Sequence, residues 1–181
     1  MKAILISIKP KYVADILNDK KTLEIRKTMP KCELPIDVYI YCTKEEYLAC
    51  DTYTGKRRYN AFPKGTNGFT QSGMVLAKFT LNKVEIINAY DEPERWYMTN
   101  SMGGGKLMEK SCLTYEELNS YLKGKNGYAW HIDNLVIFDR PKELNEFKKR
   151  NGCMDFQGYV KYLYEPLTKA PQSWQFVESE K

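Results

Sequence analysis

Residues 19–26 read DKKTLEIR, and apolar and polar side chains alternate in the second half of this stretch. Alternation of this kind is the period-2 pattern of a β-strand, with Leu23 and Ile25 on one face and Glu24 and Arg26 on the other. Two residues that share a strand face are roughly 6 to 7 Å apart along the chain. Glu24 and Arg26 can therefore pair with each other, or both can contact one ligand. An ordinary ion pair on a strand face, worth about 1 kcal/mol or less if exposed, explains the same two residues.

The segment before this stretch predicts a strand and then a short helix. Residues 3–9 alternate, with three isoleucines on one face, as expected for a half-buried strand. Pro10 follows at a position that the first turn of a helix tolerates, and an apolar stripe of helical spacing runs from Tyr12 to Leu17. The pattern ends at Asn18, so the chain is expected to begin with a strand, a short helix and a tight turn.

Further strands and helices are expected downstream. A capping-box spacing at Thr114 and Glu117 begins one helix, and residues 141–147 predict another short one. The longest strand is expected to carry a bulge near Asn82. The strands expected after residue 26 cover residues 36–42, 73–89, 127–138 and 173–177.

Two segments interrupt this order and read as insertions. Residues 44–72 are polar and rich in tyrosine, and residues 91–125 contain a run of three glycines that lacks the spacing of a phosphate-binding loop. Short strands with helices between them, without a βαβ rhythm, predict an α+β fold: a small mixed β-barrel with short flanking helices and two insertions. Because no linker or repeat marks a boundary, residues 1–181 are expected to form a single domain.

Composition indicates a globular protein with a mild positive charge. The chain has 181 residues, of which 43% are apolar, enough to fill one core, and it contains no run of about 18 apolar residues. A secretory cleavage site is not evident after the first strand, so a cytoplasmic location without a membrane partner is expected. The net charge is +5, and residues 1–60 hold 12 basic and 8 acidic side chains. Such an asymmetry suits a local phosphate-binding patch, although solvated lysines give the same count.

The cysteines and the single histidine limit the chemistry. The five cysteines are widely spaced and contain no Cys-x-x-Cys pair, so reduced structural thiols are expected. His131 is the only histidine, which excludes a multi-histidine metal site and a Ser-His-Asp triad built on another base. A metal site would have to consist of carboxylates, and neither a metal nor a cofactor is expected. His131 itself is expected to be a structural histidine.

The stretch at residues 19–26 resembles a known family motif. It is similar to the ASCH signature Gly-x-Lys-x-x-Glu-x-Arg, with Asp19 in place of the glycine. The context is similar as well, because the signature follows a strand that ends in Ile8-Lys9-Pro10 and a first helix. The resemblance spans nearly the whole chain apart from the two insertions. Further runs that look like those of ASCH proteins common in bacterial phages and prophages lie at residues 127–132, 139–142 and 170–174.

The resemblance implies a PUA-like barrel with a cleft that binds RNA or modified nucleobases. One branch of small bacterial ASCH proteins hydrolyses the acetyl amide of acetylcytidine with a lysine and a threonine of this motif and a glutamate on a later strand. Lys21 matches that lysine, but Glu24 stands at the position of the threonine, and Thr22 lies two residues away. Other members resemble nucleases, in which carboxylates and basic groups act on phosphate. The resemblance therefore implies contact with nucleic acid and leaves the chemistry open.

The candidate site residues fall into three groups. Lys21 acts as a base if burial lowers its pKa, and holds a phosphate if it is exposed. Trp130 and Trp174 are candidates for stacking on bases, and packing in the core is the competing interpretation. In the first insertion, cations alternate with aromatic residues as in single-strand binders, although a solvated loop explains the same string. The polar residues expected to line the cleft are Lys9, Lys21, Glu24 and Arg26, and the cations of the insertion are Lys56, Arg57 and Arg58.

Three hypotheses about function follow. The first is a binding module that takes RNA or a modified nucleotide in the barrel cleft, with DNA as an alternative ligand, and its binding should weaken as salt rises. The second is a hydrolase, either a ribonuclease or a nucleoside amidohydrolase, that uses Lys21 and Glu24 as an acid-base pair. The third is a phage protein that binds a host protein through the tyrosine-rich insertion.

Overall fold

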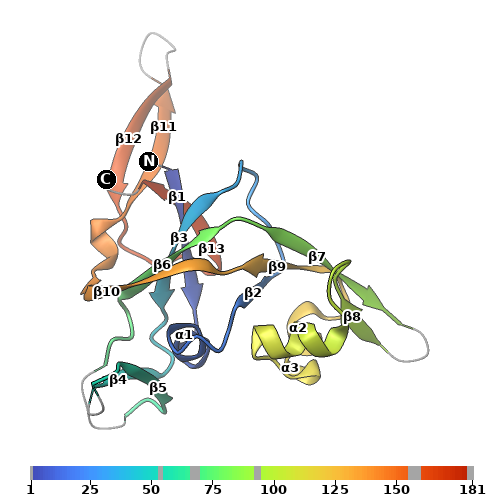
Figure 1. Ribbon diagram of the computed structural model, residues 1–181. Helices are drawn as coiled ribbons and strands as arrows, with labels where there is room; N and C mark the ends of the chain where they lie inside the picture. The colour runs from blue at the N-terminus through green and yellow to red at the C-terminus, as the bar shows by residue number, and fades with distance from the viewer. Residues whose placement is uncertain (1, 53–54, 66–69, 92–94, 155–159, 179–181) are drawn as a thin grey trace.

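The computed structural model describes residues 2–52, 55–65, 70–91, 95–154 and 160–178, and strands dominate it (Figure 1). The helical elements are α1 (Pro10–Leu17), α2 (Gly104–Ser111), α3 (Tyr115–Leu122) and the 3-10 turn η1 (Leu144–Glu146). The strands are β1 (Lys2–Ile8), β2 (Leu23–Arg26), β3 (Ile36–Cys42), β4 (Tyr47–Asp51), β5 (Arg58–Phe62), β6 (Val75–Leu81), β7 (Val84–Tyr90), β8 (Trp96–Met98), β9 (Gly127–His131), β10 (Asp133–Lys142), β11 (Lys148–Met154), β12 (Val160–Pro166) and β13 (Trp174–Glu178).

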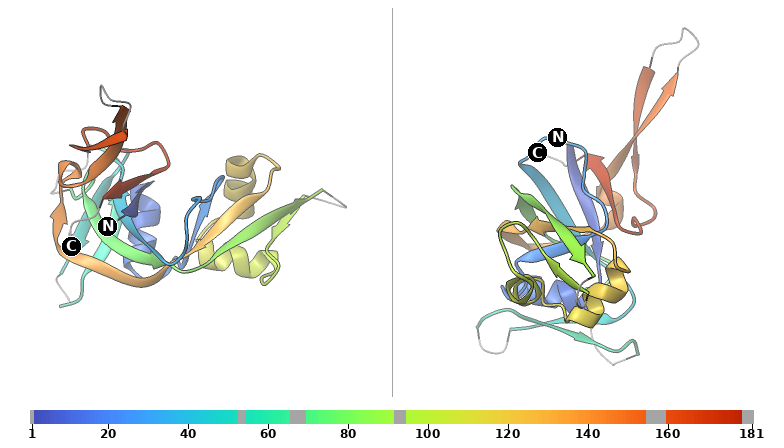
Figure 2. Two further views of the ribbon diagram at one scale, coloured as in Figure 1. Left: turned by 90° about the horizontal axis from the view of Figure 1, so that it is seen from above. Right: turned by 90° about the vertical axis from the view of Figure 1, so that its right-hand side faces the viewer.

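Two main sheets share the chain, which crosses between them four times, first around β2 and later through short links. The larger sheet has the strand order β10-β6-β3-β1-β13-β11-β12, and the smaller one has the order β2-β9-β7-β8. The chain passes from the larger sheet to the smaller one between β6 and β7, and it returns between β9 and β10 (Figure 2, left). This curled arrangement with short helices has the predicted α+β class and is consistent with a small PUA-like barrel.

Three of the strand predictions need correction. Residues 127–138 were expected as one strand but belong to two, β9 in the smaller sheet and β10 in the larger one. The segment expected as one strand over residues 73–89 is two strands, because the chain leaves the larger sheet after Leu81 and enters the smaller one at Val84. The bulge expected near Asn82 is this crossing point. The first strand is buried on both faces rather than one, because the neighbours Ile4 and Leu5 point to opposite faces of β1 and belong to different core clusters.

Helix α1 has the bounds predicted from the sequence, and its apolar side packs into the larger core cluster. In the turn after α1, the backbone N–H groups of Lys20 and Lys21 both donate to the carbonyl of Asp15. Asp19 in this turn has a φ of 59°, in the left-handed region that favours glycine. Aspartate tolerates that region better than most other residues. The substitution of Asp19 for the signature glycine therefore preserves the turn.

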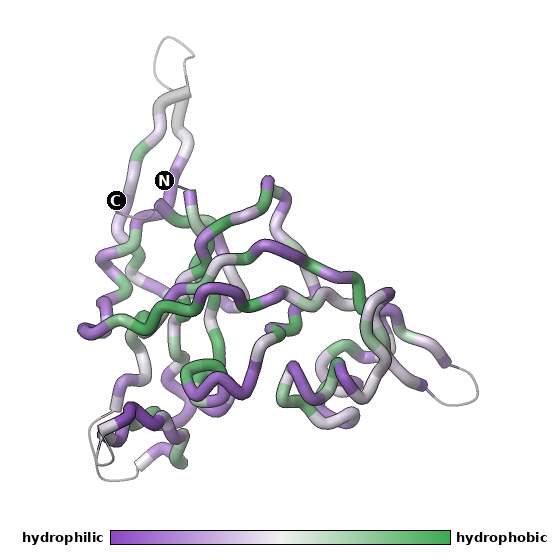
Figure 3. Tube along the Cα trace, in the orientation of Figure 1, coloured by the Kyte–Doolittle hydropathy of each residue, from purple (hydrophilic) through white to green (hydrophobic). Residues whose placement is uncertain are grey.

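The first insertion contains the hairpin β4–β5 (Figure 1), which contributes to the core. Leu48 and Tyr59 are buried in the same cluster as the apolar side of α1. The Asn18 side chain donates to the carbonyl of Tyr59 over 2.8 Å and accepts from the N–H of Tyr59 over 3.1 Å. Much of the hairpin is hydrophilic (Figure 3). The segment thus covers the end of α1 with one side and faces solvent with the other.

The second insertion supplies β8, α2 and α3, which pack against the smaller sheet around a second core cluster. The predicted capping box is confirmed, since Thr114 Oγ1 accepts from the N–H of Glu117 and the Glu117 carboxylate accepts from the N–H of Thr114. Helix α2 and strand β8 were not predicted. Leu107 and Leu118 bring α2 and α3 into this cluster, where they meet the apolar side chains of β2.

The C-terminal third differs most from expectation. The helix predicted over residues 141–147 is wrong, because β10 continues to Lys142 and only the short turn η1 follows. The hairpin β11–β12 was not predicted. The final strand prediction is confirmed by β13, which pairs antiparallel with β1.

The described cysteines are free thiols, as expected; they are Cys32, Cys42, Cys50 and Cys112. Burial raises the pKa of the Cys42 thiol to about 12, so this thiol stays protonated and unreactive at neutral pH. No helix in the described part of the chain is both long and apolar enough to cross a bilayer.

Candidate functional site

Strand β2 and the turn before it bring Lys21, Glu24 and Arg26 into one buried group, the charged cluster. The three residues are 3%, 6% and 7% exposed, respectively. Two cations share one carboxylate: Glu24 Oε2 lies 3.4 Å from Lys21 Nζ, and Glu24 Oε1 lies 2.9 Å from Arg26 Nη2. Glu24 and Arg26 thus pair with each other, as the alternation of residues 22–26 allowed. The pair lies inside the protein, however, rather than on an exposed strand face.

Three distant segments hold the two cations in place. Lys21 Nζ donates to the carbonyl of Ser111 at the end of α2 over 2.6 Å. Arg26 Nη2 donates to the carbonyl of Ser7 on β1 over 2.7 Å, and Arg26 Nη1 donates to the hydroxyl of Ser173 over 3.3 Å. Within the described part of the chain, Arg26 Nε is buried without a hydrogen-bond partner. The guanidinium is therefore fixed on one side and keeps one unused donor.

The electrostatics of the charged cluster depend on Lys21. Burial lowers the pKa of the Lys21 ammonium, and the neighbouring Glu24 carboxylate opposes that shift. With Lys21 protonated, the cluster carries two positive charges and one negative charge, an excess that suits an anionic ligand. With Lys21 neutral, its amine becomes a base held beside a carboxylate.

Three partly exposed aromatic side chains surround the charged cluster. Lys21 Nζ lies 5.4 Å from the centre of the Tyr12 ring. Burial raises the pKa of the Tyr121 phenol, and the Arg26 guanidinium opposes that rise, which places Tyr121 beside the cluster. Trp174 directly follows Ser173, whose hydroxyl accepts from Arg26. We call these three residues the aromatic rim: Tyr12 of α1, Tyr121 of α3 and Trp174 of β13.

Helices α1 and α3 are tied together at the aromatic rim. Lys11 Nζ lies 2.8 Å from Glu117 Oε1, and the Tyr12 hydroxyl donates to the same carboxylate over 3.4 Å. Lys27 directly follows β2, and its ammonium lies 4.9 Å from the centre of the Tyr121 ring. The rim thus combines exposed aromatic surface with nearby cations.

Comparison with known proteins rests on the fold. No family model matches the chain, and no curated protein sequence matches it either. Among solved structures, an ASCH protein from Zymomonas mobilis matches with a TM-score of 0.56 and 14% identity, covering 97% of this chain and 87% of that one. A serine-to-alanine variant and a tyrosine-to-phenylalanine variant of the same protein match with TM-scores of 0.55 and the same identity, covering 88% and 91% of those chains. The chain has the ASCH fold. The resemblance to ASCH proteins that the motif predicted is therefore confirmed for the fold.

Within the ASCH fold, the two candidate tryptophans have different surroundings. Trp130 is 0% exposed and belongs to the larger core cluster, so a base has no access to its ring and the stacking interpretation does not fit this residue. Core packing explains it. Trp174 is partly exposed, and its ring centre lies 5.8 Å from that of Trp130. Its indole N–H donates to the hydroxyl of Thr28 over 3.0 Å. Because only Trp174 is partly exposed, it is the only one of the two tryptophans that can meet a ligand.

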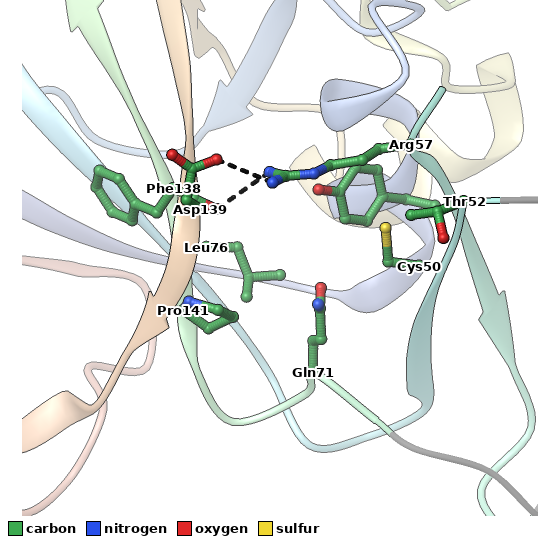
Figure 4. A pocket seen from close by; sticks show the side chains of 9 residues that line it. Cys50, Thr52, Arg57, Gln71, Leu76, Phe138, Asp139 and Pro141 are labelled. Atoms are coloured by element: carbon green, nitrogen blue, oxygen red, sulfur yellow. Dashed lines mark hydrogen bonds and ion pairs between the residues drawn. The ribbon is translucent and has the colours of Figure 1, made fainter. Parts of the chain in front are cut away.

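The remaining candidate cations lie apart from the charged cluster. Lys9 is exposed and pairs with Glu45 of the first insertion over 3.1 Å. The cations of the insertion lie on or beside β5, where Arg57 pairs with Asp139 of β10 over 2.9 Å. This pair borders a pocket of about 270 Å³ between the hairpin β4–β5 and β10 (Figure 4), and Tyr59 is among its lining residues. The expectation that Lys9 lines the same cleft as Lys21 therefore has no geometric support.

A second polar cluster, centred on the buried side chains of Glu85 and Thr99, was missed from the sequence. Glu85 on β7 accepts hydrogen bonds from Thr99 over 2.7 Å and Ser101 over 2.5 Å, and its other oxygen lies 2.8 Å from His131 Nε2 and 2.6 Å from Lys83 Nζ. Burial of the carboxyl opposes ionisation, but the hydrogen bonds from these four side chains outweigh it and lower the pKa of Glu85 to about 2. His131 is thus held by Glu85 and has the structural environment expected of it.

Glu85 cannot supply the glutamate that the acetylcytidine mechanism requires beside Lys21. In the pairing of β2, β9 and β7, Glu85 and Ile25 both lie opposite Ala129, so these residues share one face of the smaller sheet. Glu24 directly precedes Ile25 on β2, so its side chain points to the other face of the sheet. The two polar clusters are therefore separated by the sheet.

Proposed function

We propose that this protein binds single-stranded RNA or a modified nucleotide at the aromatic rim, with the charged cluster beneath the ligand. The observation that carries this proposal is the position of three partly exposed aromatic rings around two cations and one carboxylate. The proposal places this activity in the cytoplasm, where thiols such as those of the described cysteines remain reduced.

The chemistry of each part suits a nucleotide. Aromatic rings stack on bases without strict sequence preference and contribute about 1 to 3 kcal/mol per base. Guanidinium and ammonium groups bind phosphate or carbonyl oxygens, and a carboxylate accepts from the amino groups of a base. Because the charged cluster is covered, we infer that the rim side chains move aside when a ligand enters. Arg26 Nε, which has no partner among the described residues, is then a donor for the ligand.

Replacing rim aromatics should weaken binding of a fluorescein-labelled single-stranded RNA. We expect Tyr121→Ala and Trp174→Ala each to lower the affinity about fivefold to a hundredfold, because a stacked base loses its platform. Fluorescence anisotropy titrations at several salt concentrations measure this, and affinity should fall as salt rises. A DNA oligonucleotide of the same sequence shows whether the 2′-hydroxyl contributes.

A matched control for these variants is Trp96→Ala. Trp96 on β8 is 39% exposed and lies in the smaller sheet against Tyr90, away from the charged cluster. Its loss should leave RNA affinity unchanged within about twofold. Rim variants that bind as well as the parent protein, or a parent protein that binds neither RNA, DNA nor nucleotides, would refute the proposal.

We also propose a hydrolase as the second candidate, because Lys21 Nζ lies 3.4 Å from Glu24 Oε2 and burial lowers the Lys21 pKa, the direction that a general base requires. On an acylated cytidine, the Lys21 amine would take a proton from water while the oxygen adds to the acyl carbon. The carbon-nitrogen bond then breaks, the proton passes to the departing amino group, and acetate and cytidine are released. This scheme uses Lys21 as the base and needs no threonine at the position of Glu24.

Incubation with acetylcytidine and with end-labelled RNA, followed by chromatography, tests this second candidate. We expect the parent protein to release product and Lys21→Met to lose at least a hundredfold of the rate, as removal of a general base does. Lys20→Met is the control, since Lys20 is exposed and adjacent in sequence. Unchanged substrate with the parent protein leaves binding as the function; equal rates for both variants exclude Lys21 as the base.

A further inference from the structure

The hairpin β11–β12 projects from the rest of the protein as an arm (Figures 1 and 2). β12 pairs only with β11 among the described strands, and β11 joins the larger sheet through the pairing of Lys148 with Glu178. The side chains of residues 148–150 and 162–166 are exposed. Such a two-stranded ribbon buries little of its own surface, so both of its faces are open to a partner.

The register of the arm separates its side chains into two faces. Arg150 lies opposite Tyr164, and Lys149 lies opposite Glu165. Directly opposed residues share a face, and neighbours along a strand alternate. We therefore define a cationic face and a neutral face. The cationic face carries Lys148, Arg150, Tyr162 and Tyr164, and the neutral face carries Lys149, Asn151, Leu163 and Glu165.

Charges on the neutral face cancel within the arm. Lys149 Nζ lies 3.8 Å from Glu165 Oε2, and the Asn151 side chain donates to the same oxygen over 2.6 Å. The one acidic side chain in the described part of the arm is thus engaged on this face. Leu163, which is 46% exposed, adds apolar surface without charge.

The cationic face differs from the neutral face in its charge and in its exposed aromatic side chains. The Arg150 guanidinium lies 3.3 Å above the centre of the Tyr162 ring, and no described acidic side chain pairs with it. Tyr162 and Tyr164 are 47% and 51% exposed. Lys148 contributes less, because Glu178 lies opposite it at the base of the arm. A guanidinium stacked on tyrosine beside a second open tyrosine combines a phosphate-binding cation with two stacking platforms.

We propose that the cationic face of the arm binds a single-stranded nucleic acid, with Arg150 on a phosphate and bases stacked on Tyr162 and Tyr164. The spacing supports this partner: residues two apart on a strand lie roughly 6 to 7 Å apart, about twice the 3.4 Å rise per base of a stacked strand. One base therefore fits between the two tyrosines. The inference rests on the proposed function for its class of ligand, a single-stranded nucleic acid. It adds the cationic face of the arm as a second contact surface, which only a strand long enough to extend beyond the aromatic rim can reach.

The test compares variants on the two faces of the arm. The probes are a fluorescein-labelled oligouridine long enough to extend beyond the rim and, separately, a labelled uridine mononucleotide. We expect Tyr162→Ala and Tyr164→Ala each to weaken oligouridine binding about fivefold to a hundredfold. Arg150→Ala should weaken it as well and reduce the slope of log affinity against log salt by about 0.7, the value for one phosphate contact on a single strand.

Lys149→Ala is the matched control, because it changes the net charge of the chain by the same amount and lies on the neutral face of the same hairpin. It should leave oligouridine affinity within about threefold of the parent and the salt slope unchanged, and mononucleotide binding should be unaffected by every arm variant.

Equal effects of Arg150→Ala and Lys149→Ala would overturn the proposal, since only net charge would then matter. Arm variants that keep oligouridine affinity but lose a protein partner would overturn it too. If rim variants lose binding while arm variants retain it, the arm proposal fails and the proposed function stands; if the parent binds neither probe, both fail.

Discussion

Glu24→Ala is expected to lower the free energy of unfolding by about 3 to 5 kcal/mol. The variant leaves Lys21 and Arg26 buried without the carboxylate that both contact. An uncompensated buried charge is far more costly than the loss of a surface ion pair, because neither water nor a counter-ion replaces the missing partner. For a chain of this length, the melting temperature should fall on the order of 10 °C. Urea denaturation followed by circular dichroism measures the change.

Glu45→Ala provides the comparison for this experiment. It removes a glutamate from the ion pair with Lys9, in which both side chains are more than half exposed. Exposed pairs contribute about 1 kcal/mol or less, so this variant should unfold close to the parent. A Glu24→Ala protein as stable as Glu45→Ala would mean that water reaches the charged cluster, and would argue against a covered site.

The second large effect is a dependence of stability on acid through Glu85. Its pKa lies at about 2, below the ordinary value of 4.5, because four donors to the carboxylate outweigh the effect of burial. A carboxyl group with a lowered folded-state pKa stabilises the protein fully above its unfolded-state pKa, and this contribution disappears as pH falls through the folded-state value. The contribution of Glu85 is therefore expected to be lost between about pH 4.5 and pH 2.

Glu85→Gln isolates this contribution. At neutral pH the variant should be less stable by roughly 2 to 3 kcal/mol, because the hydrogen bonds to a charged acceptor are lost. Its stability should also fall less steeply than that of the parent below pH 4.5, so the two curves converge at low pH. Denaturant melts across the pH range measure both features. Parallel curves for parent and variant would show that other groups cause the acid sensitivity.

The sequence stretch at residues 19–26 predicted which side chains meet but not where they lie. Alternation placed Glu24 and Arg26 on one strand face, and the structure pairs them. The hydrogen-bond partners of the two buried cations are Ser111 for Lys21 and Ser7 and Ser173 for Arg26, which are distant in sequence and ordinary in type. A local pattern contains no information about such partners. For the same reason the aromatic rim was only partly anticipated, through Trp174.

Other features left weak or misleading signals. The alternation over residues 73–89 changes phase near Asn82, and a bulge within one strand explains that change as well as a passage to another sheet does. The arm gave only a compositional strand signal, in the residues VKYLY at 160–164, because both of its faces are exposed and no core side produces a regular alternation of apolar and polar residues. The local sequence does not mark Glu85 as the centre of a polar cluster, since its partners Thr99 and Ser101 come from a later loop.

The position of β13 in the larger sheet has a consequence for how the protein matures on the ribosome. β13 fills the place beside β1, and Ser173 in front of it contacts Arg26, which lies near the start of the chain. During synthesis β1 can pair with β3 early, but one of its edges stays open until residues 174–178 emerge. Until then the nascent chain lacks both the Ser173 contact to Arg26 and a partner for this edge of β1, and the emergence of residues 173–178 supplies both together.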